Sequence, residues 1–329
     1  MRPGGSVIAL DQLRQADYPA EKIEVVVAEG HWPPRQRNLA VAHSGGEIVY
    51  CLDDDSWVPS DLFTRVVAHY EDKGTAVVGG PSLTPTTDGA LQRCIGYVLG
   101  SYFGTLTMHA RYSPVGKVRW SSEKELITCN LSLRREVFCK EGGFNEAIFP
   151  NDETEMLSRL AHKGYKMIYD PSVFVERSQR RSFSELAKQF FSYGTGRIKQ
   201  MFLHPSLVVW RFLLPLLGLV YLVISPILFF IYAWWPLLPL VPYIAVTLLM
   251  TVYVTVRERD AWALIFLPLI YPVIHACYGA GLSWELVRSV YQRLNGHQEH
   301  QQMMPITVVK VKEFEQDWND ESLRYRLHS

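Results

Sequence analysis

Hydrophobic residues are distributed unevenly along this chain, and the change comes near residue 205. Between positions 207 and 256 the one charged residue is Arg211, and between positions 261 and 284 there is none. About 20 consecutive apolar residues suffice to cross a bilayer as a helix. Because these runs are too long and too aromatic for buried core helices, they predict a membrane domain of hydrophobic segments.

Before residue 183 the pattern is that of a soluble α/β region. Short apolar runs of strand length alternate with segments of helical period, and Gly, Pro and Asp separate them. This rhythm favours a doubly wound, mostly parallel sheet. Strands are expected at 23–28, 47–52, 75–78, 126–133 and 166–170, and helices at 7–16, 35–43 and 59–70.

The chain opens with a helical pattern, although a sheet of this kind usually opens with a strand. We therefore expect the first strand to be missing. Residues 81–118 have no clear period and are expected to form a loop-and-helix insertion over the site. The expected organisation is an α/β domain over 1–182, an interfacial amphipathic helix over 183–206, about three hydrophobic membrane segments over 207–287, and a polar tail over 288–329.

Charge and cysteine content exclude several classes of function. The 33 Lys and Arg residues balance the 33 Asp and Glu residues, so the chain carries no overall signal for binding nucleic acid. The five cysteines are scattered without the spacing of metal ligands. This usage favours a reducing compartment and argues against a disulfide framework.

Three consecutive aspartates, Asp53, Asp54 and Asp55, follow the apolar run 47–52. In an open α/β sheet, ligands bind at the carboxyl ends of the strands. Neighbouring carboxylates repel each other, and a hard divalent metal that bridges to a phosphate is the simplest way to keep them ionised. The alternative is a solvated acidic turn between a strand and a loop.

A second acidic group, Asp152, Glu153 and Glu155, begins a predicted helix with Asn151 as its N-cap. Acidic side chains in a first turn complement the helix dipole, so a structural role is one interpretation. The other interpretation is that one of these carboxylates points into a site and takes a proton from a substrate hydroxyl.

A basic stretch precedes the hydrophobic region. Between positions 177 and 211 aromatic residues are interleaved with seven Lys or Arg residues and one acid, Glu185. This composition indicates an interfacial helix on the cytoplasmic face of a membrane. Cytoplasmic segments of membrane proteins carry an excess of Lys and Arg, and this tendency explains the stretch by itself. Phosphate binding by some of the arginines is a second, compatible interpretation.

These clusters, in this order, resemble glycosyltransferase family 2 over nearly the whole chain up to about residue 285. Residues 17–30 look like the family's Q-x-Y-P motif and the strand after it, and residues 35–40 look like its A-R-N-x-G helix start. Residues 52–55 are similar to its metal-binding D-x-D element. Residues 142–160 look like its GGF motif followed by E-D-x-x-L-x-x-R-L.

The resemblance implies a GT-A-like fold and roles for individual residues. Asp53 and Asp55 would hold Mg²⁺ or Mn²⁺, with Asp54 turned away. Glu153 takes the place of the family's catalytic aspartate and would be the base, with Asp152 orienting it. Contacts with the nucleotide sugar would come from Glu29, Arg37, Asp53, Asn130 and Arg180.

The sequence departs from the family pattern at several points. The family's first strand, which normally forms part of the nucleotide-base pocket, has no counterpart here. Glu29 stands for the family acid after the second strand, and the acid pair at 152–153 reads Asp-Glu where the family has Glu-Asp. Residues 179–183 keep the Gln of the Gln-x-x-Arg-Trp motif of processive members but lack its Arg and Trp, which favours addition of a single sugar.

The sequence therefore predicts an inverting glycosyltransferase in the cell membrane, with its catalytic domain in the cytoplasm. It would move one sugar from a nucleoside-diphosphate sugar to a lipid-linked acceptor in polysaccharide or glycan synthesis. Transfer directly to polyprenyl phosphate is the alternative enzyme. A non-catalytic nucleotide-sugar-binding membrane protein is an alternative of another class, and a transporter is poorly supported.

Topology is only partly determined by the sequence. The uncharged turn at 234–236 is expected outside, and the charged residues 257–260 return the chain to the cytoplasm. Three simple spans would place the tail outside. A third segment that is kinked or re-entrant at Pro268 and Pro272 is the alternative.

Overall fold

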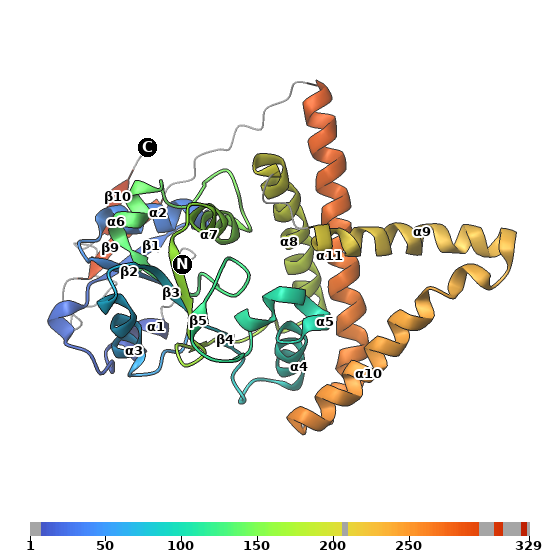
Figure 1. Ribbon diagram of the computed structural model, residues 1–329, viewed down its shortest axis with the longest axis horizontal. Coiled ribbons are helices and arrows are strands. Elements are labelled where there is room, and N and C mark those ends of the chain that lie inside the picture. The colour runs from blue at the N-terminus through green and yellow to red at the C-terminus, as the bar shows by residue number, and fades with distance from the viewer. Residues whose placement is uncertain (1–7, 206–209, 296–305, 312–323, 328–329) are drawn as a thin grey trace. The chain divides into compact units, whose positions relative to one another are not determined.

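Five strands form the central sheet of the protein (Figure 1). The structure is a computed structural model, and it describes residues 8–205, 210–295, 306–311 and 324–327. In the order in which they pair, the strands are β2 (Ile48–Leu52), β6 (Asn130–Arg134), β3 (Thr75–Gly79), β7 (Lys166–Tyr169) and β5 (Arg119–Trp120).

Strand β6 runs antiparallel to both of its neighbours, whereas β3 and β7 pair in parallel. The α/β class is confirmed, but the pairing is mixed where the sequence favoured a mostly parallel sheet. The register gives the reason. Asn130, at the start of β6, pairs with Leu52 at the end of β2, and Leu131 pairs with Gly79 at the end of β3. The chain therefore enters β6 from the edge at which it left β3.

Helices cover both faces of this sheet. Val77 and Val78 of β3 are both 0% exposed and belong to different hydrophobic clusters, because successive side chains of a strand point to opposite faces. The cluster around Val77 includes side chains of α2 (Pro33–His43), α6 (Arg135–Lys140) and α7 (Asp152–His162). The cluster around Val78 includes side chains of α1 (Ile8–Leu13) and α3 (Leu62–Ala68).

A second sheet joins an early and a late part of the chain. Strand β1 (Val25–Glu29) pairs antiparallel with β9 (Ile306–Val311), which pairs antiparallel with β10 (Arg324–Leu327). Ile306 and Val308 are buried. Strand β9 lies in the segment that we predicted to be a polar tail. A small parallel pair is formed by β4 (Ser82–Leu83) and β8 (Val175–Glu176).

The chain divides into two compact units. The first comprises residues 1–85, 110–178 and 299–329, and the second comprises 86–109 and 179–298. Residues 86–109, which we expected in the α/β domain, group with the second unit. The helices of that unit are α4 (Ala90–Leu99), α5 (Tyr102–Thr105), α8 (Phe183–Leu203), α9 (Leu214–Tyr232), α10 (Leu240–Glu258) and α11 (Ala263–Asn295).

Short 3-10 turns connect several of these elements. They lie at Ala20–Lys22, His69–Glu71, Leu106–Arg111, Trp210–Leu213 and Trp235–Leu237. Two of them extend α9 and α10 at their amino ends.

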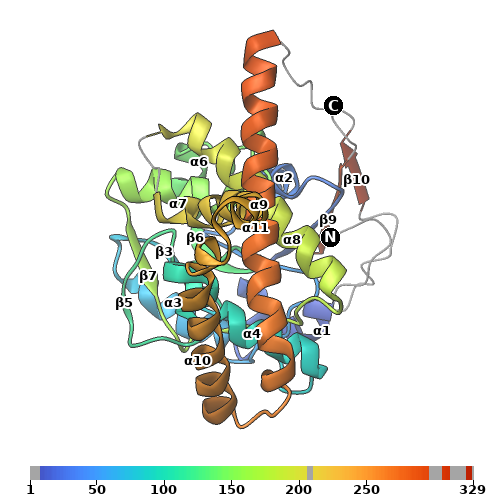
Figure 2. The same ribbon diagram turned by 90° about the vertical axis from the view of Figure 1, so that its right-hand side faces the viewer.

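Three helical segments of the described chain are long and apolar enough to cross a membrane. They are Trp210–Tyr232, Trp235–Glu258 and Ala263–Asn295. The last of them runs beside α8 (Figures 1 and 2). A Cβ on Gly281 of α11 would lie 2.0 Å from the carbonyl oxygen of Phe191 in α8, so the two backbones approach closely at this glycine.

Candidate functional site

Arg177 lies between two of the three consecutive aspartates. Its Nη1 is 2.8 Å from Oδ2 of Asp53, and its Nε is 2.8 Å from Oδ1 of Asp55. The preceding residue positions this guanidinium, because Glu176 and Trp57 exchange backbone hydrogen bonds of 2.8 and 2.9 Å. The carboxyl end of β2 therefore carries an acidic pair that holds a cationic side chain.

The carboxylates of this turn influence one another. The pKa of Asp55 lies above its ordinary value, mainly because partial loss of solvent around this half-exposed side chain disfavours the charged form. The nearby Asp53 and Asp54 raise this pKa further, and the Arg177 guanidinium lowers it. An additional positive charge beside the pair would favour ionised carboxylates.

The acidic pair suits a hard divalent cation as a partial site. Mg²⁺ prefers oxygen ligands and is usually bound by one or two carboxylates together with waters and substrate phosphates. Asp53 and Asp55 supply two such groups. Within the part of the chain that the structure describes, no group of three or more His, Cys, Asp or Glu side chains is arranged to hold a metal ion. The pair therefore fits a cation whose other ligands come from substrate and water, and Arg177 competes for the same oxygens.

Arg37, in α2, connects the two acidic clusters. Its Nη1 donates to Oδ2 of Asp152 at 2.7 Å, and its Nη2 lies 3.8 Å from Oδ1 of Asp53. Burial raises the pKa of Asp152 to about 6, although Arg37 lowers it. Burial lowers the pKa of Arg37, but the charges of Asp152 and Asp53 outweigh it, so this pKa lies above its ordinary value. Negatively and positively charged side chains thus alternate from Asp152 through Arg37, Asp53 and Arg177 to Asp55.

Glu153 is held differently from its neighbour Asp152. Nη1 of Arg111 donates to its Oε1 at 2.8 Å, and the hydroxyl of Thr128 donates to its Oε2. The Glu153 side chain is 20% exposed, whereas that of Asp152 is 4% exposed. A carboxylate that is fixed in place and still accessible has the geometry that a general base requires.

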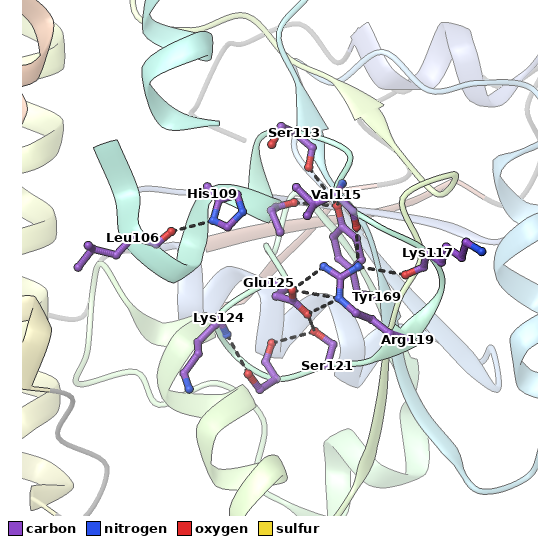
Figure 3. A network of polar contacts seen from close by, with 12 residues as sticks. Leu106, His109, Ser113, Val115, Lys117, Arg119, Ser121, Lys124, Glu125 and Tyr169 are labelled. Atoms are coloured by element: carbon purple, nitrogen blue, oxygen red, sulfur yellow. Dashed lines mark hydrogen bonds and ion pairs between the residues drawn. The ribbon is translucent and has the colours of Figure 1, made fainter. Parts of the chain in front are cut away.

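The segment that carries Arg111 is bonded to the central sheet through Arg119 of β5 and Tyr169 of β7, which Figure 3 shows. Nη2 of Arg119 donates to Oε1 of Glu125 at 2.6 Å, and the guanidinium lies 4.4 Å from the ring centroid of Tyr169 in β7. The Tyr169 hydroxyl donates to the carbonyl of Ala110 at 3.0 Å. These contacts fix the loop on both sides of Arg111, and so they fix the side chain that holds Glu153.

The turn Gly142-Gly143-Phe144 is bonded to two helices. Gly143 has φ of +64°, and a Cβ there would lie 2.6 Å from Oδ1 of Asn38. That oxygen accepts a hydrogen bond of 2.9 Å from the backbone N–H of Phe144. From α7, Nη2 of Arg159 donates to the carbonyl of Gly143 at 2.6 Å. The motifs that carried the family resemblance therefore contact one another and place the start of α7 beside α2.

Asn130, which we predicted to contact the sugar or the acceptor, lies in the core. It is 0% exposed, and its Nδ2 donates to the carbonyls of Pro81 at 3.0 Å and Val173 at 2.9 Å. Its Oδ1 accepts a hydrogen bond from the hydroxyl of Tyr50. Because the whole amide is satisfied inside the protein, the prediction of ligand contact is wrong. Asn130 joins the segments that follow β3 and β7.

Two other predicted binding residues have contacts of their own. Glu29 ends β1 and is opposite Thr307 of β9 in the register. Arg180 is exposed and belongs to the second unit, where its Nε lies 3.4 Å from Oε1 of Gln189. Their assignment to nucleotide-sugar binding stays a prediction. The other predicted site residues (Arg37, Asp53, Asp55, Asp152 and Glu153) lie together on the elements around the carboxyl end of β2.

Sequence reasoning missed Arg111 and Thr128 and did not connect Arg177 with the aspartates. Arg177 was noted as the first residue of the basic stretch, but it is 122 positions from its partner Asp55, and no local pattern connects them. Arg111 lies in a segment without periodicity, and Thr128 lies in a predicted strand. The one available signal was electrostatic, because an acidic triplet requires a cation nearby.

The chain is similar to a known family and to known proteins. A family model described as glycosyl transferase family group 2 matches residues 48–277, a range that contains both acidic clusters. The succinoglycan biosynthesis protein ExoA of Rhizobium meliloti (strain 1021) is 24% identical over 258 residues, which cover 76% of this chain and 73% of that protein. Among solved structures, the mannosyltransferase PcManGT from Pyrobaculum calidifontis, in complex with GDP-Man and Mn²⁺, is 17% identical with a TM-score of 0.49 and covers 84% of this chain and 81% of its own.

Proposed function

Because the chain belongs to glycosyl transferase family group 2, we propose that it transfers a single sugar, with inversion, from a nucleoside-diphosphate sugar to a membrane-associated acceptor. The observation that carries this proposal is the alternating line of charges from Asp152 to Asp55, which sits beside the accessible carboxylate of Glu153. The name of the relative ExoA supports a role in polysaccharide synthesis.

Asp53 and Asp55 would hold Mg²⁺ or Mn²⁺ together with the diphosphate of the donor. A bound divalent ion would neutralise the negative charge that develops on the leaving diphosphate. Arg177 lies within 2.8 Å of both aspartates. Its side chain would therefore either move away when the ion binds or turn toward a phosphate oxygen. A guanidinium is well suited to phosphate because its donors form a planar fork.

Glu153 would act as the general base in a single displacement. The acceptor oxygen attacks the anomeric carbon while its proton passes to the Glu153 carboxylate. The bond from the anomeric carbon to the diphosphate oxygen breaks, and its electron pair leaves with the diphosphate. Arg111 and Thr128 orient the base through its two oxygens.

Asp152 would be a positioning residue and not the base. Its carboxylate is enclosed and bonded to Arg37, which extends toward Asp53. This pair would hold α7 at a fixed distance from the acidic turn. The Asp-Glu order at 152–153, which departs from the family pattern, therefore still leaves the second residue of the pair as the accessible carboxylate.

The acceptor would be lipid-linked and the catalytic unit cytoplasmic at the cell membrane. The three candidate membrane helices and the basic residues of α8 support this, because an enzyme reaches a bilayer-anchored substrate at the surface of the bilayer. Transfer directly to polyprenyl phosphate is the second candidate within the same reaction class. A non-catalytic nucleotide-sugar-binding protein is the candidate of another class, and the Arg177 contact with both aspartates is the observation in its favour.

The experiment is sugar transfer in membranes that contain the full-length chain. Radiolabelled nucleoside-diphosphate sugars are supplied with Mg²⁺, Mn²⁺ or EDTA, and lipid extracts are analysed for labelled product. We expect transfer to require a divalent ion and to fall by about 10²–10⁴-fold in Glu153→Gln, the usual effect of removing a general base.

Glu136→Gln is the matched control, because Glu136 is an exposed glutamate in the first turn of α6. Full activity of Glu153→Gln would contradict the assignment of the base. Donor binding without transfer to any lipid would favour the non-catalytic protein.

A further inference from the structure

Both ends of the long helix α11 are connected, by contacts or along the chain, to segments that lie on one side of the membrane. From this we propose that α11 does not cross the membrane. Helices α9 and α10 cross it as a hairpin, and α11 lies along the membrane surface beside α8, in contact with the lipid headgroup region. The inference goes beyond the proposed function, since it concerns how the chain meets the bilayer.

The strand that follows α11 belongs to the same sheet as β1. Five residue pairs join β1 and β9, from Val25↔Val311 to Glu29↔Thr307. Strand β1 precedes the three long apolar helices in the chain, and β9 follows them. A small open sheet does not extend through a bilayer, so both strands lie on the same side of it. The number of crossings between them is therefore even, and three spans are excluded.

The connection between α11 and β9 does not supply a further crossing. Residues 296–305 contain one glutamate, two histidines and three glutamines. Ten residues reach about 35 Å when fully extended, which is close to the thickness of a bilayer core of about 30 Å. An extended polar backbone is not tolerated in hydrocarbon, however. The carboxyl end of α11 is therefore on the side of β9.

The amino-terminal half of α11 is bonded to segment 86–109. Nε and Nη2 of Arg93 lie 3.0 and 2.9 Å from Oδ2 of Asp260, just before α11, and Oγ of Ser101 lies 3.1 Å from the hydroxyl of Tyr271. Segment 86–109 leaves and re-enters the first unit directly at both ends. Its helix α4 has ten residues and is about 15 Å long, which is too short to cross a membrane. Both ends of α11 are therefore on the same side of the membrane, which is the side of β1 and β9.

The centre of α11 meets the beginning of α9. A Cβ on Gly279, the middle residue of α11, would lie 2.4 Å from the carbonyl oxygen of Pro215 in the first turn of α9. If α11 crossed the membrane, this first turn would lie at the middle of the bilayer. Helix α9 runs across α11 in Figure 1 and is seen end-on in Figure 2, whereas α11 is upright in both views. The two helices therefore cross each other and do not form a parallel pair of spans.

Helix length and exposure agree with this division. Helices α9 and α10 each have 19 residues, about 29 Å, which matches a bilayer core of about 30 Å. Helix α11 has 33 residues and is about 50 Å long. Its most apolar window is 33% buried inside the protein, compared with 6% and 17% for the other two spans.

Helices α8 and α11 expose side chains that suit a membrane surface. Large apolar side chains are exposed at both ends of α11, and exposed Lys188 and Arg293 provide cations for anionic headgroups. The exposed apolar residues are Leu264, Ile265 and Leu269 near its start, and Trp284, Val287, Val290 and Leu294 near its end.

The test uses cysteine accessibility in the full-length protein. Cys139 is exposed on α6 of the first unit and marks the side of the catalytic sheet. Single cysteines are added at both ends of α11 (Ala261→Cys and Asn295→Cys) and between α9 and α10 (Trp235→Cys). Inside-out and right-side-out vesicles are treated with a membrane-impermeant polyethylene glycol maleimide, and each variant is compared with the parent.

Ala261→Cys and Asn295→Cys should gain a label in the vesicle orientation in which Cys139 reacts. Trp235→Cys should gain a label in the opposite orientation. The proposal is overturned if Asn295→Cys reacts from the side opposite to Cys139 or from neither side, or if Trp235→Cys reacts from the side of Cys139. Labelling after solubilisation in detergent shows that each added thiol is reactive in the folded protein.

Discussion

Nη1 of Arg177 lies 2.8 Å from Oδ2 of Asp53, although the two residues belong to different ends of the first unit. The same guanidinium reaches Asp55 through Nε. An acidic pair that the sequence presented as a metal site is thus already bonded to a cation of the chain. Binding of a divalent ion must compete with this contact, and the competition can be measured.

Replacing Arg177 with Gln should strengthen the binding of Mn²⁺ in the absence of donor. The two aspartates would lose a cation that competes for their oxygens, and their mutual repulsion would increase. We expect the dissociation constant for Mn²⁺ to fall by about tenfold, which corresponds to about 1.4 kcal/mol. Electron paramagnetic resonance of free Mn²⁺ measures this constant. Arg177→Lys keeps the charge and is the control; equal or weaker binding by Arg177→Gln would argue against the competition.

The carboxyl of Asp152 should make the stability of the protein depend on pH. Its pKa is about 6 in the folded protein, and in the unfolded chain it is close to the ordinary value of about 3.9. The folded protein therefore holds this proton more tightly, and the stabilising contribution is complete below about pH 4 and is lost as the pH rises through 6.

Comparison with Asp152→Asn isolates this contribution. The free energy of unfolding of the parent, minus that of the variant, should decrease between pH 4 and pH 7, by an amount on the order of 3 kcal/mol, and should change little above pH 7. Urea unfolding of the purified protein in detergent measures it. A difference that is constant or rises with pH would mean that Asp152 ionises normally in the folded state.

Asn130 should matter for stability and not for donor binding. Replacement by Ala leaves the carbonyls of Pro81 and Val173 and the hydroxyl of Tyr50 without their amide partner. Each buried group left unsatisfied costs about 1–3 kcal/mol, so we expect a clearly lower unfolding temperature. The KM for the donor, measured at a temperature where the variant is folded, should be unchanged. A raised KM with normal stability would restore a ligand-binding role.

Gly281 should be required for the packing of α8 against α11. Alanine there would place a Cβ 2.0 Å from the carbonyl oxygen of Phe191, which must move. Although Gly→Ala in a helix interior is otherwise favourable by about 1 kcal/mol, we expect Gly281→Ala to lower the unfolding temperature in detergent. Gly218→Ala in α9 is the matched control, since a Cβ there meets nothing within 4 Å. Equal stability of the two variants would argue against close contact of these helices.

The sequence predicted the elements of this site better than their connections. The positions of Asp53 after a strand and of Asp152 in a first helical turn followed from hydrophobic period and capping residues, which are local properties. The contacts of Arg177 and Arg111 depend on how distant segments meet, and no local pattern encodes that. Asn130 was assigned to the site through the family resemblance, but burial of its amide depends on the segments after β3 and β7.

Local sequence patterns could not predict the pairing of β1 with β9 either. Val308 is an apolar residue in a polar tail, and a strand of this length gains stability only from a partner. The sequence pattern gave no sign that a late segment would pair with β1. The direction of β6 was missed for a related reason, because the path of residues 80–129 decides the edge from which that strand begins.

The role of Glu153 as the base in metal-dependent sugar transfer is the central claim. Its most direct test is the rate of release of nucleoside diphosphate from a saturating nucleotide sugar, measured in membranes with excess lipid-linked acceptor and Mn²⁺. We expect Glu153→Gln to lower kcat by about 10²–10⁴-fold with little change in the KM for the donor, and Glu136→Gln to match the parent. A kcat of Glu153→Gln equal to that of the parent, or release that persists unchanged in EDTA, would contradict the claim.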